Sequence, residues 1–267
     1  ALAVVLVLAI AAGGFFLPNF VSARLDRAEQ DTAFSLSTGD EQGPATVLRR
    51  KLTDGMQNLF YGAEDPVELD ESAAAHTRDD MTRYAQTFLT ALYKDCELFG
   101  ADFTDDGVSV DYASYGSGFV LWSITLSDPR GDSVTLLLDD TTGCPLAIGY
   151  SFADSYAFQL EQNGLWSYLL RVFENRIAVT ISAALGATYD EVQIPMPDAA
   201  KKMLKLSAGS KTTVPLHPLS AGSADSNVNG NAIDYLQFYD PDAGVAFSLP
   251  ARHSGSTLLF NTEWFGD

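Results

Sequence analysis

The chain has 267 residues, of which 46% are hydrophobic, so it can build a packed core and is not a disordered chain. Its 16 Lys and Arg against 35 Asp and Glu give a formal net charge of −19, which repels phosphate backbones and excludes nucleic acid as a favoured partner. Two cysteines and three histidines are too few for a disulfide framework or a cysteine-based zinc site. The sequence predicts no cofactor and no metal site.

The N-terminal segment indicates the cellular compartment in which the protein acts. Residues 1–17 carry no charged or polar side chain, and apolar residues resume after Pro18 and Asn19. This stretch is slightly short for a spanning helix of about 20 residues and slightly long for a signal-peptide core. Small residues ending at Ala23 offer a signal-peptidase site. We expect residues 1–23 to be a membrane anchor, with a cleaved signal or a buried core helix as alternatives. The first two place the remaining chain outside the cytoplasm.

Residues 24–66 predict a tether that contains a short helix. Up to Gly43 the composition mixes acidic, amide, hydroxyl and glycine residues with few large apolar ones. Leu48, Leu52 and Met56 then recur at four-residue intervals, which is typical of one face of a helix.

A helix followed by strands is predicted for residues 67–158. Apolar side chains between Met81 and Phe99 share one helix face, and Thr77 with Asp80 has the spacing of a capping box. After Gly100 the apolar period changes from 3.6 to 2. Strands are expected around the apolar residues 108–110, 120–126, 134–138 and 146–148. This pattern predicts a helix packed on an antiparallel meander.

The pattern recurs in residues 159–267. An apolar stripe runs from Trp166 to Ala184 and ends at Gly186. Strand-like segments follow at 203–206, 212–216, 232–239, 245–249 and 257–265. The turn from Asp240 to Gly244 matches the turn from Asp139 to Gly143, which favours an internal duplication. The predicted fold class is α+β, with an N-terminal hydrophobic helix followed by two helix-plus-antiparallel-meander units.

One hairpin resembles a known family. Residues 77–152 resemble the PepSY-like extracytoplasmic domain, whose hairpin carries Asp-x-x-Thr-Gly, here Asp139, Thr142 and Gly143. A degenerate second copy has Ala243 in place of the threonine. The resemblance implies a helix on a small antiparallel sheet and a bacterial accessory or propeptide-like role, in a family where some members are proposed to restrain peptidases. It transfers no catalytic residue.

Motifs for catalysis are missing from the sequence. There is no Gly-x-Ser-x-Gly pentapeptide and no His-Glu-x-x-His, so a serine esterase and a metalloprotease are both disfavoured. Acidic clusters at 102–106 and 240–242 lack the spacing of a calcium loop, and solvated turns are the preferred interpretation. The sequence therefore predicts no catalytic residue.

Six residues are candidates for binding or cross-linking. Tyr112, Tyr115, Trp264 and Phe265 are the aromatic residues expected to be exposed for recognition. Cys96 and Cys144 are expected near the same core layer, as two buried thiols or, alternatively, as a disulfide that an oxidising compartment allows.

The composition and the resemblance together predict a membrane-anchored or secreted extracytoplasmic module. It would bind a protein or peptide partner, contact the membrane only through its N-terminal segment, and carry out no catalysis. One alternative is a hydrolase that uses two carboxylates on cell-wall or glycan substrates. A second alternative is a structural domain of an envelope complex.

Overall fold

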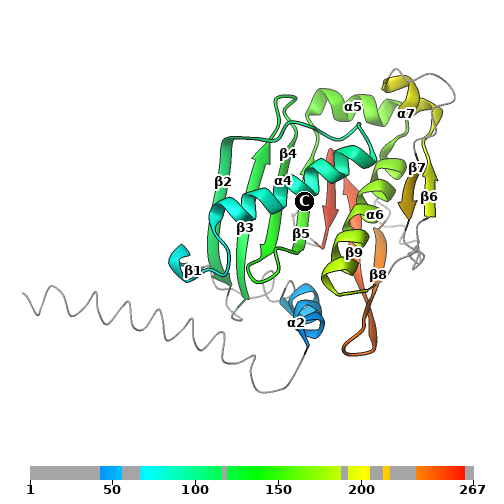
Figure 1. Ribbon diagram of the computed structural model, residues 1–267. Helices are drawn as coiled ribbons and strands as arrows, with labels where there is room; N and C mark the ends of the chain where they lie inside the picture. Colours follow the sequence, from blue (N-terminus) through cyan, green and yellow to red (C-terminus); the bar gives the residue numbers. More distant parts are fainter. Residues whose placement is uncertain are drawn as a thin grey trace, which may run out of the picture. The chain divides into compact units, whose positions relative to one another are not determined.

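The computed structural model describes residues 43–55, 67–115, 119–187, 192–204, 213–216 and 233–261 (Figure 1). These residues form one continuous eight-stranded antiparallel sheet, several helices and a separate two-stranded sheet. The predicted fold of two helix-plus-meander units is therefore wrong, because strands from both halves of the chain pair within the same sheet. The apolar helix predicted for residues 1–23 lies outside the described residues.

The strand order of the large sheet is β1-β2-β3-β4-β5-β10-β9-β8. Its strands are β1 (Val67–Glu68), β2 (Thr104–Tyr115), β3 (Phe119–Ser127), β4 (Ser133–Asp139), β5 (Pro145–Ser151), β8 (Ile233–Asp240), β9 (Val245–Ser254) and β10 (Thr257–Phe260). Strands β10 and β5 form the seam between the two halves, with Thr257 opposite Ser151 and Phe260 opposite Ile148. The small sheet pairs β6 (Val192–Pro195) with β7 (Thr213–Leu216).

Two long helices lie across one face of the large sheet (Figure 1). The helix α4 (Arg78–Asp95) contacts β3, whereas α6 (Trp166–Ala184) contacts β5, β10, β9 and β8. The shorter helices are α2 (Pro44–Arg50), the π-helix η1 (Lys51–Gly55), the 3-10 helix η2 (Glu71–Ala73), α5 (Asp154–Gln162) and α7 (Asp198–Met203). Among the described residues, no helix has both the length and the apolar character needed to cross a bilayer.

Helix α4 begins where the sequence predicts but ends at Asp95, before the predicted stop at Gly100, whereas α6 begins and ends as predicted. The Thr77 side chain accepts from the Asp80 backbone N–H, and the Asp80 carboxylate accepts from Thr77, so the capping box is confirmed. At the end of α6, Gly186 has a φ of +68°, a left-handed conformation that glycine adopts without strain. One local prediction is wrong, because Met203 ends the helix α7 and does not begin a strand.

The main core lies between the sheet and the helices. Alternate residues of the strands, such as Trp122, Ile124 and Leu136, are fully buried. Leu169, Phe173 and Ile177 of α6 are equally buried. Each such side chain contributes roughly 1.5–3 kcal/mol when removed from water, so this face accounts for much of the stability.

Candidate functional site: a hydroxyl-lined pocket on the sheet

We define the polar face as the face of β3, β4, β5, β10 and β9 that lies opposite α4 and α6. Successive side chains of a strand point to opposite faces, so each strand contributes to both. In β4, Val134 and Leu136 are fully buried, whereas Ser133 and Thr135 are only partly buried. The strands are therefore apolar toward the helices and rich in small polar residues on the polar face.

A row of hydroxyl side chains crosses the polar face. The strand register places Ser127 opposite Ser133, Ser133 opposite Ser151, Ser151 opposite Thr257, and Thr257 opposite Ser254. We call these five residues the hydroxyl row. Neighbouring strands lie about 4.8 Å apart, and each hydroxyl both donates and accepts a hydrogen bond. The row is therefore a regular series of neutral hydrogen-bonding groups that spans five strands.

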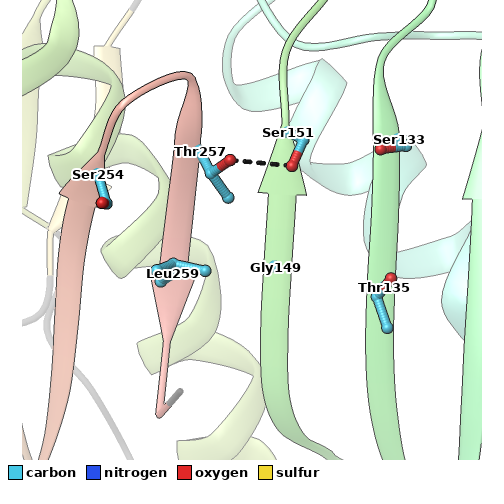
Figure 2. A pocket seen from close by; sticks show the side chains of 7 residues that line it. All are labelled: Ser133, Thr135, Gly149, Ser151, Ser254, Thr257 and Leu259. Carbon is cyan, nitrogen blue, oxygen red and sulfur yellow. Dashed lines mark hydrogen bonds between the residues drawn. The ribbon is translucent and has the colours of Figure 1, made fainter. Parts of the chain in front are cut away.

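A pocket of about 320 Å³ lies over the row and crosses the seam (Figure 2). Its lining comprises Ser133, Thr135, Gly149, Ser151, Ser254, Thr257 and Leu259. At its centre the hydroxyls of Ser151 and Thr257 are hydrogen-bonded to each other at 2.9 Å. Gly149 has no side chain to fill the space beside them, and Leu259 is buried and gives the pocket an apolar element. This volume is at the lower end of the range for small-molecule sites.

Among the described residues, none of those that line the pocket is a histidine, a cysteine or a carboxylate, the side chains most often used in acid, base or nucleophilic catalysis. His253 is the chain neighbour of Ser254, but it points to the opposite face, where its ring stacks on Trp166 with 4.0 Å between centroids. Burial there lowers the pKa of His253 and favours its neutral form. A serine without a nearby base is a poor nucleophile.

Behind the pocket, a buried polar network fixes the end of β5. The Tyr150 hydroxyl accepts from the backbone N–H of Gly100 at 2.6 Å and donates to Asp132 at 2.9 Å. Asp132 also accepts from the backbone N–H of Ala153 at 3.0 Å and pairs with Arg130. Burial, reinforced by the Asp132 charge, raises the pKa of Tyr150 well above its usual value, so Tyr150 stays a neutral donor. The adjacent Ser151 is thereby held in place.

Tyr112 belongs to a second buried network and not to an exposed binding surface. Its side chain is only 3% exposed, and its ring lies 4.6 Å from that of Trp122. The Trp122 indole N–H donates to Asp140 at 2.7 Å, and the backbone N–H of Ala75 donates to the same carboxylate at 2.9 Å. The expectation that Tyr112 is exposed is wrong, because Tyr112 lies directly opposite Trp122 in the register and therefore shares its buried face.

The two cysteines are buried thiols that are not bonded to each other. Burial raises the pKa of Cys96 to about 11, and it raises that of Cys144 as well. Because the thiolate is the reactive form, burial disfavours nucleophilic reactivity of both thiols. The disulfide alternative does not describe this structure.

The other predicted site residues cannot be placed in the pocket. Tyr115 is the last residue of β2, but its side chain is not among the described parts of the chain. Trp264 and Phe265 lie outside the described residues. Among the described residues there is no cluster of three or more potential metal-ligating side chains.

Sequence reasoning missed the pocket residues, although their signal is present. Ser123, Thr125 and Ser127 alternate with apolar residues, and so do Ser133 and Thr135. The alternation shows that each strand has a hydroxyl side. The pairing of β5 with β10, which brings the hydroxyls together, has no local signal.

Comparisons of the chain with family models, with curated proteins and with solved structures gave no match.

Proposed function

We propose that the protein is a non-catalytic binding module and that the pocket on the polar face is its ligand site. The observation that carries this proposal is that four residues of the hydroxyl row, Ser133, Ser151, Thr257 and Ser254, line a pocket of about 320 Å³ whose described lining has no acid, base or thiol. Neutral hydroxyls bind by hydrogen bonding and carry no net charge that would attract an ion. They therefore favour a neutral polar ligand.

The favoured ligand is a neutral segment of a peptide or protein partner. An extended backbone presents alternating N–H and C=O groups, and hydroxyl side chains can bond to either. Within the pocket, the row runs from Ser133 through Ser151 and Thr257 to Ser254. A segment lying along the row would therefore meet several matching groups, while Leu259 would contact an apolar side chain.

The location of this module is the second part of the proposal. The apolar residues 1–23 support a membrane anchor or export signal, and the acidic remainder would then act outside the cytoplasm. The resemblance of residues 77–152 to PepSY-like domains supports an accessory role for the module. A structural role in an envelope complex would place the same pocket at a contact with a neighbouring subunit.

The carboxylate-dependent hydrolase gains no support from the described residues. Its mechanism requires two carboxyl groups about 5–9.5 Å apart beside the substrate, and none of the described residues that line the pocket is a carboxylate. Asp132 and Asp140 are almost fully buried and accept hydrogen bonds from the fold itself. These two carboxylates are therefore part of the buried hydrogen-bond networks of the fold.

The binding site can be tested with selected peptides. The full chain is used to select binders from a displayed library of short random peptides without charged residues. The dissociation constants of the selected peptides are then measured for the wild type and for the double variant Ser151→Ala, Thr257→Val. We expect at least about fivefold weaker binding by the variant, because each of the two neutral hydrogen bonds contributes about 0.5–1.5 kcal/mol.

Ser127→Ala is the matched control, because Ser127 belongs to the hydroxyl row but not to the pocket lining. Its affinity for the same peptides should stay within about twofold of the wild type. Peptides that bind all three proteins equally would place the site elsewhere and refute the pocket. Binding of neutral oligosaccharides in place of peptides would retain the binding module and refute the ligand class.

A further inference from the structure

Two turns of the sheet are built in the same way. In each, a buried aspartate, Asp139 or Asp240, accepts hydrogen bonds from the backbone of its own turn. The backbone N–H of the closing glycine, Gly143 or Gly244, donates to the carbonyl of that aspartate. Both glycines have a φ of +65°. The two halves of the sheet thus present equivalent carboxylates.

Both turns lie at the same end of the sheet. Strands β4, β5, β10, β9 and β8 are neighbours in this order and alternate in direction, so the β4–β5 and β8–β9 turns project from one end. Asn261 follows β10 at this end, between the two turns. The pocket lies toward the other end, where Ser151 finishes β5.

The segment 43–55, which contains α2 and η1, spans the two turns. Arg49 Nε lies 3.2 Å from Asp240, and the Lys51 ammonium pairs with Asp139. The Asn261 amide donates at 2.9 Å to the carbonyl of Leu52. Basic side chains of one short segment therefore reach the acidic turns of both halves of the sheet.

Further contacts hold the segment in place. The backbone N–H of Ala45 donates to Asp242 at 3.3 Å, and Asn261 donates a second bond at 2.9 Å to Leu146 of β5. Leu48 and Leu52 are almost fully buried. The segment thus has an apolar side that is buried and basic side chains that form ion pairs with the turns.

The seam that this segment crosses is short. Only four residue pairs join β5 to β10, and within the described large sheet no other strands pair between the two halves. Helix α6 contacts both halves from the covered face. The seam is therefore supported by α6 from the covered face and by the segment 43–55 at one end.

We propose that the segment 43–55 is a releasable strap, which closes the seam while Arg49 and Lys51 are paired and frees that end of the seam when they are not. Charge pairing is the element that can be switched, because Arg49 pairs with Asp240 of one half of the sheet and Lys51 pairs with Asp139 of the other. Since α6 remains in place, release opens the seam locally and leaves the sheet folded. The strap thereby connects the stretch after the predicted membrane segment with the strands that carry the pocket.

Hydrogen exchange of the full chain tests the proposal. The variants are Arg49→Gln, Lys51→Gln and the double variant, and the control is Arg50→Gln, which removes the same charge from the same helix without contacting either turn aspartate. Exchange is measured for peptides covering 44–55, β5 and β10, with β3 and β4 as the reference. The thermal unfolding midpoint of each variant is recorded.

The double variant should accelerate exchange in 44–55 by at least about tenfold, with a smaller increase in β10. Exchange in β3 and β4 should not change, and Arg50→Gln should match the wild type. The proposal is overturned if Arg50→Gln has the same effect as the other single variants, or if no variant changes exchange in 44–55. Equal loss of protection across 44–55, β3 and β4 also overturns it, because the segment would then be an integral part of the core.

Discussion

The two faces of the sheet use the same strands for different purposes. Tyr150 and Ser151 are adjacent in β5, yet Tyr150 is fully buried in a network with Asp132, whereas Ser151 lines the pocket. His253 and Ser254 show the same division in β9, where His253 stacks on Trp166. The alternation of strand side chains therefore separates the residues of the core from those of the pocket lining. Substitutions at neighbouring positions should have effects of very different size.

The largest loss of stability is expected from Trp122→Ala on the covered face. The Trp122 side chain is fully buried, and its indole N–H donates to Asp140. Its removal leaves a large cavity and takes a donor from a buried carboxylate, at a cost of about 3–5 kcal/mol. Urea unfolding measures the difference.

Trp122→Phe is the control, since it keeps an aromatic ring and removes the indole N–H. It should cost less than the alanine variant. Equal losses for the two variants would show that the hydrogen bond to Asp140, and not packing, accounts for the stability at this position.

Tyr150→Phe should have an intermediate effect. The variant keeps the ring and removes a hydroxyl that both accepts from Gly100 and donates to Asp132. Leaving the buried Gly100 N–H without this acceptor costs about 1–3 kcal/mol in the free energy of unfolding. A loss no larger than that of the adjacent Ser151→Ala would contradict the contrast between the two faces.

The protonation of His253 should contribute to the pH dependence of stability. Burial lowers its pKa in the folded state, so the unfolded chain binds the proton more tightly. Its contribution is present above the unfolded pKa of about 6.5 and is lost as the pH falls through the folded pKa. Carboxylates titrate in the same acidic range, so the comparison is with His253→Gln. Between pH 7 and pH 5, denaturant unfolding should show a smaller loss of stability for the variant than for the wild type.

The smallest effects are expected on the polar face. Ser127→Ala and Ser151→Ala should each change the free energy of unfolding by no more than about 0.5 kcal/mol, because partly exposed hydroxyls exchange protein partners for water. A loss above about 2 kcal/mol at either position, measured in urea, would show that the polar face is part of the stabilising core.

Local patterns predicted the two long helices and most strands of the large sheet, but not α5, α7 or β6, and non-local pairing decided how the strands are joined. The helices α4 and α6 follow from their apolar stripes and from Thr77 and Gly186, which act within a few residues. The fusion of two meanders depends on Ser151 meeting Thr257, and the sequence between them carries no sign of it. Tyr112 was misplaced because an aromatic residue fits either face of a strand, and only the register pairs it with Trp122.

The position of β10 has a consequence for the order of folding. It is the last strand along the described chain, yet it lies between β5 and β9 in the interior of the sheet. Strands β2 to β5 pair with near neighbours in sequence, and such local contacts form early. The pairing of β5 with β10 closes a connection of about 100 residues and is therefore expected to form late. During synthesis, the edge of β5 therefore stays unpaired until residues 257–260 have been made. A chain truncated before Thr257 would keep that edge exposed, with Leu146 and Ile148 on it, and would be prone to aggregate.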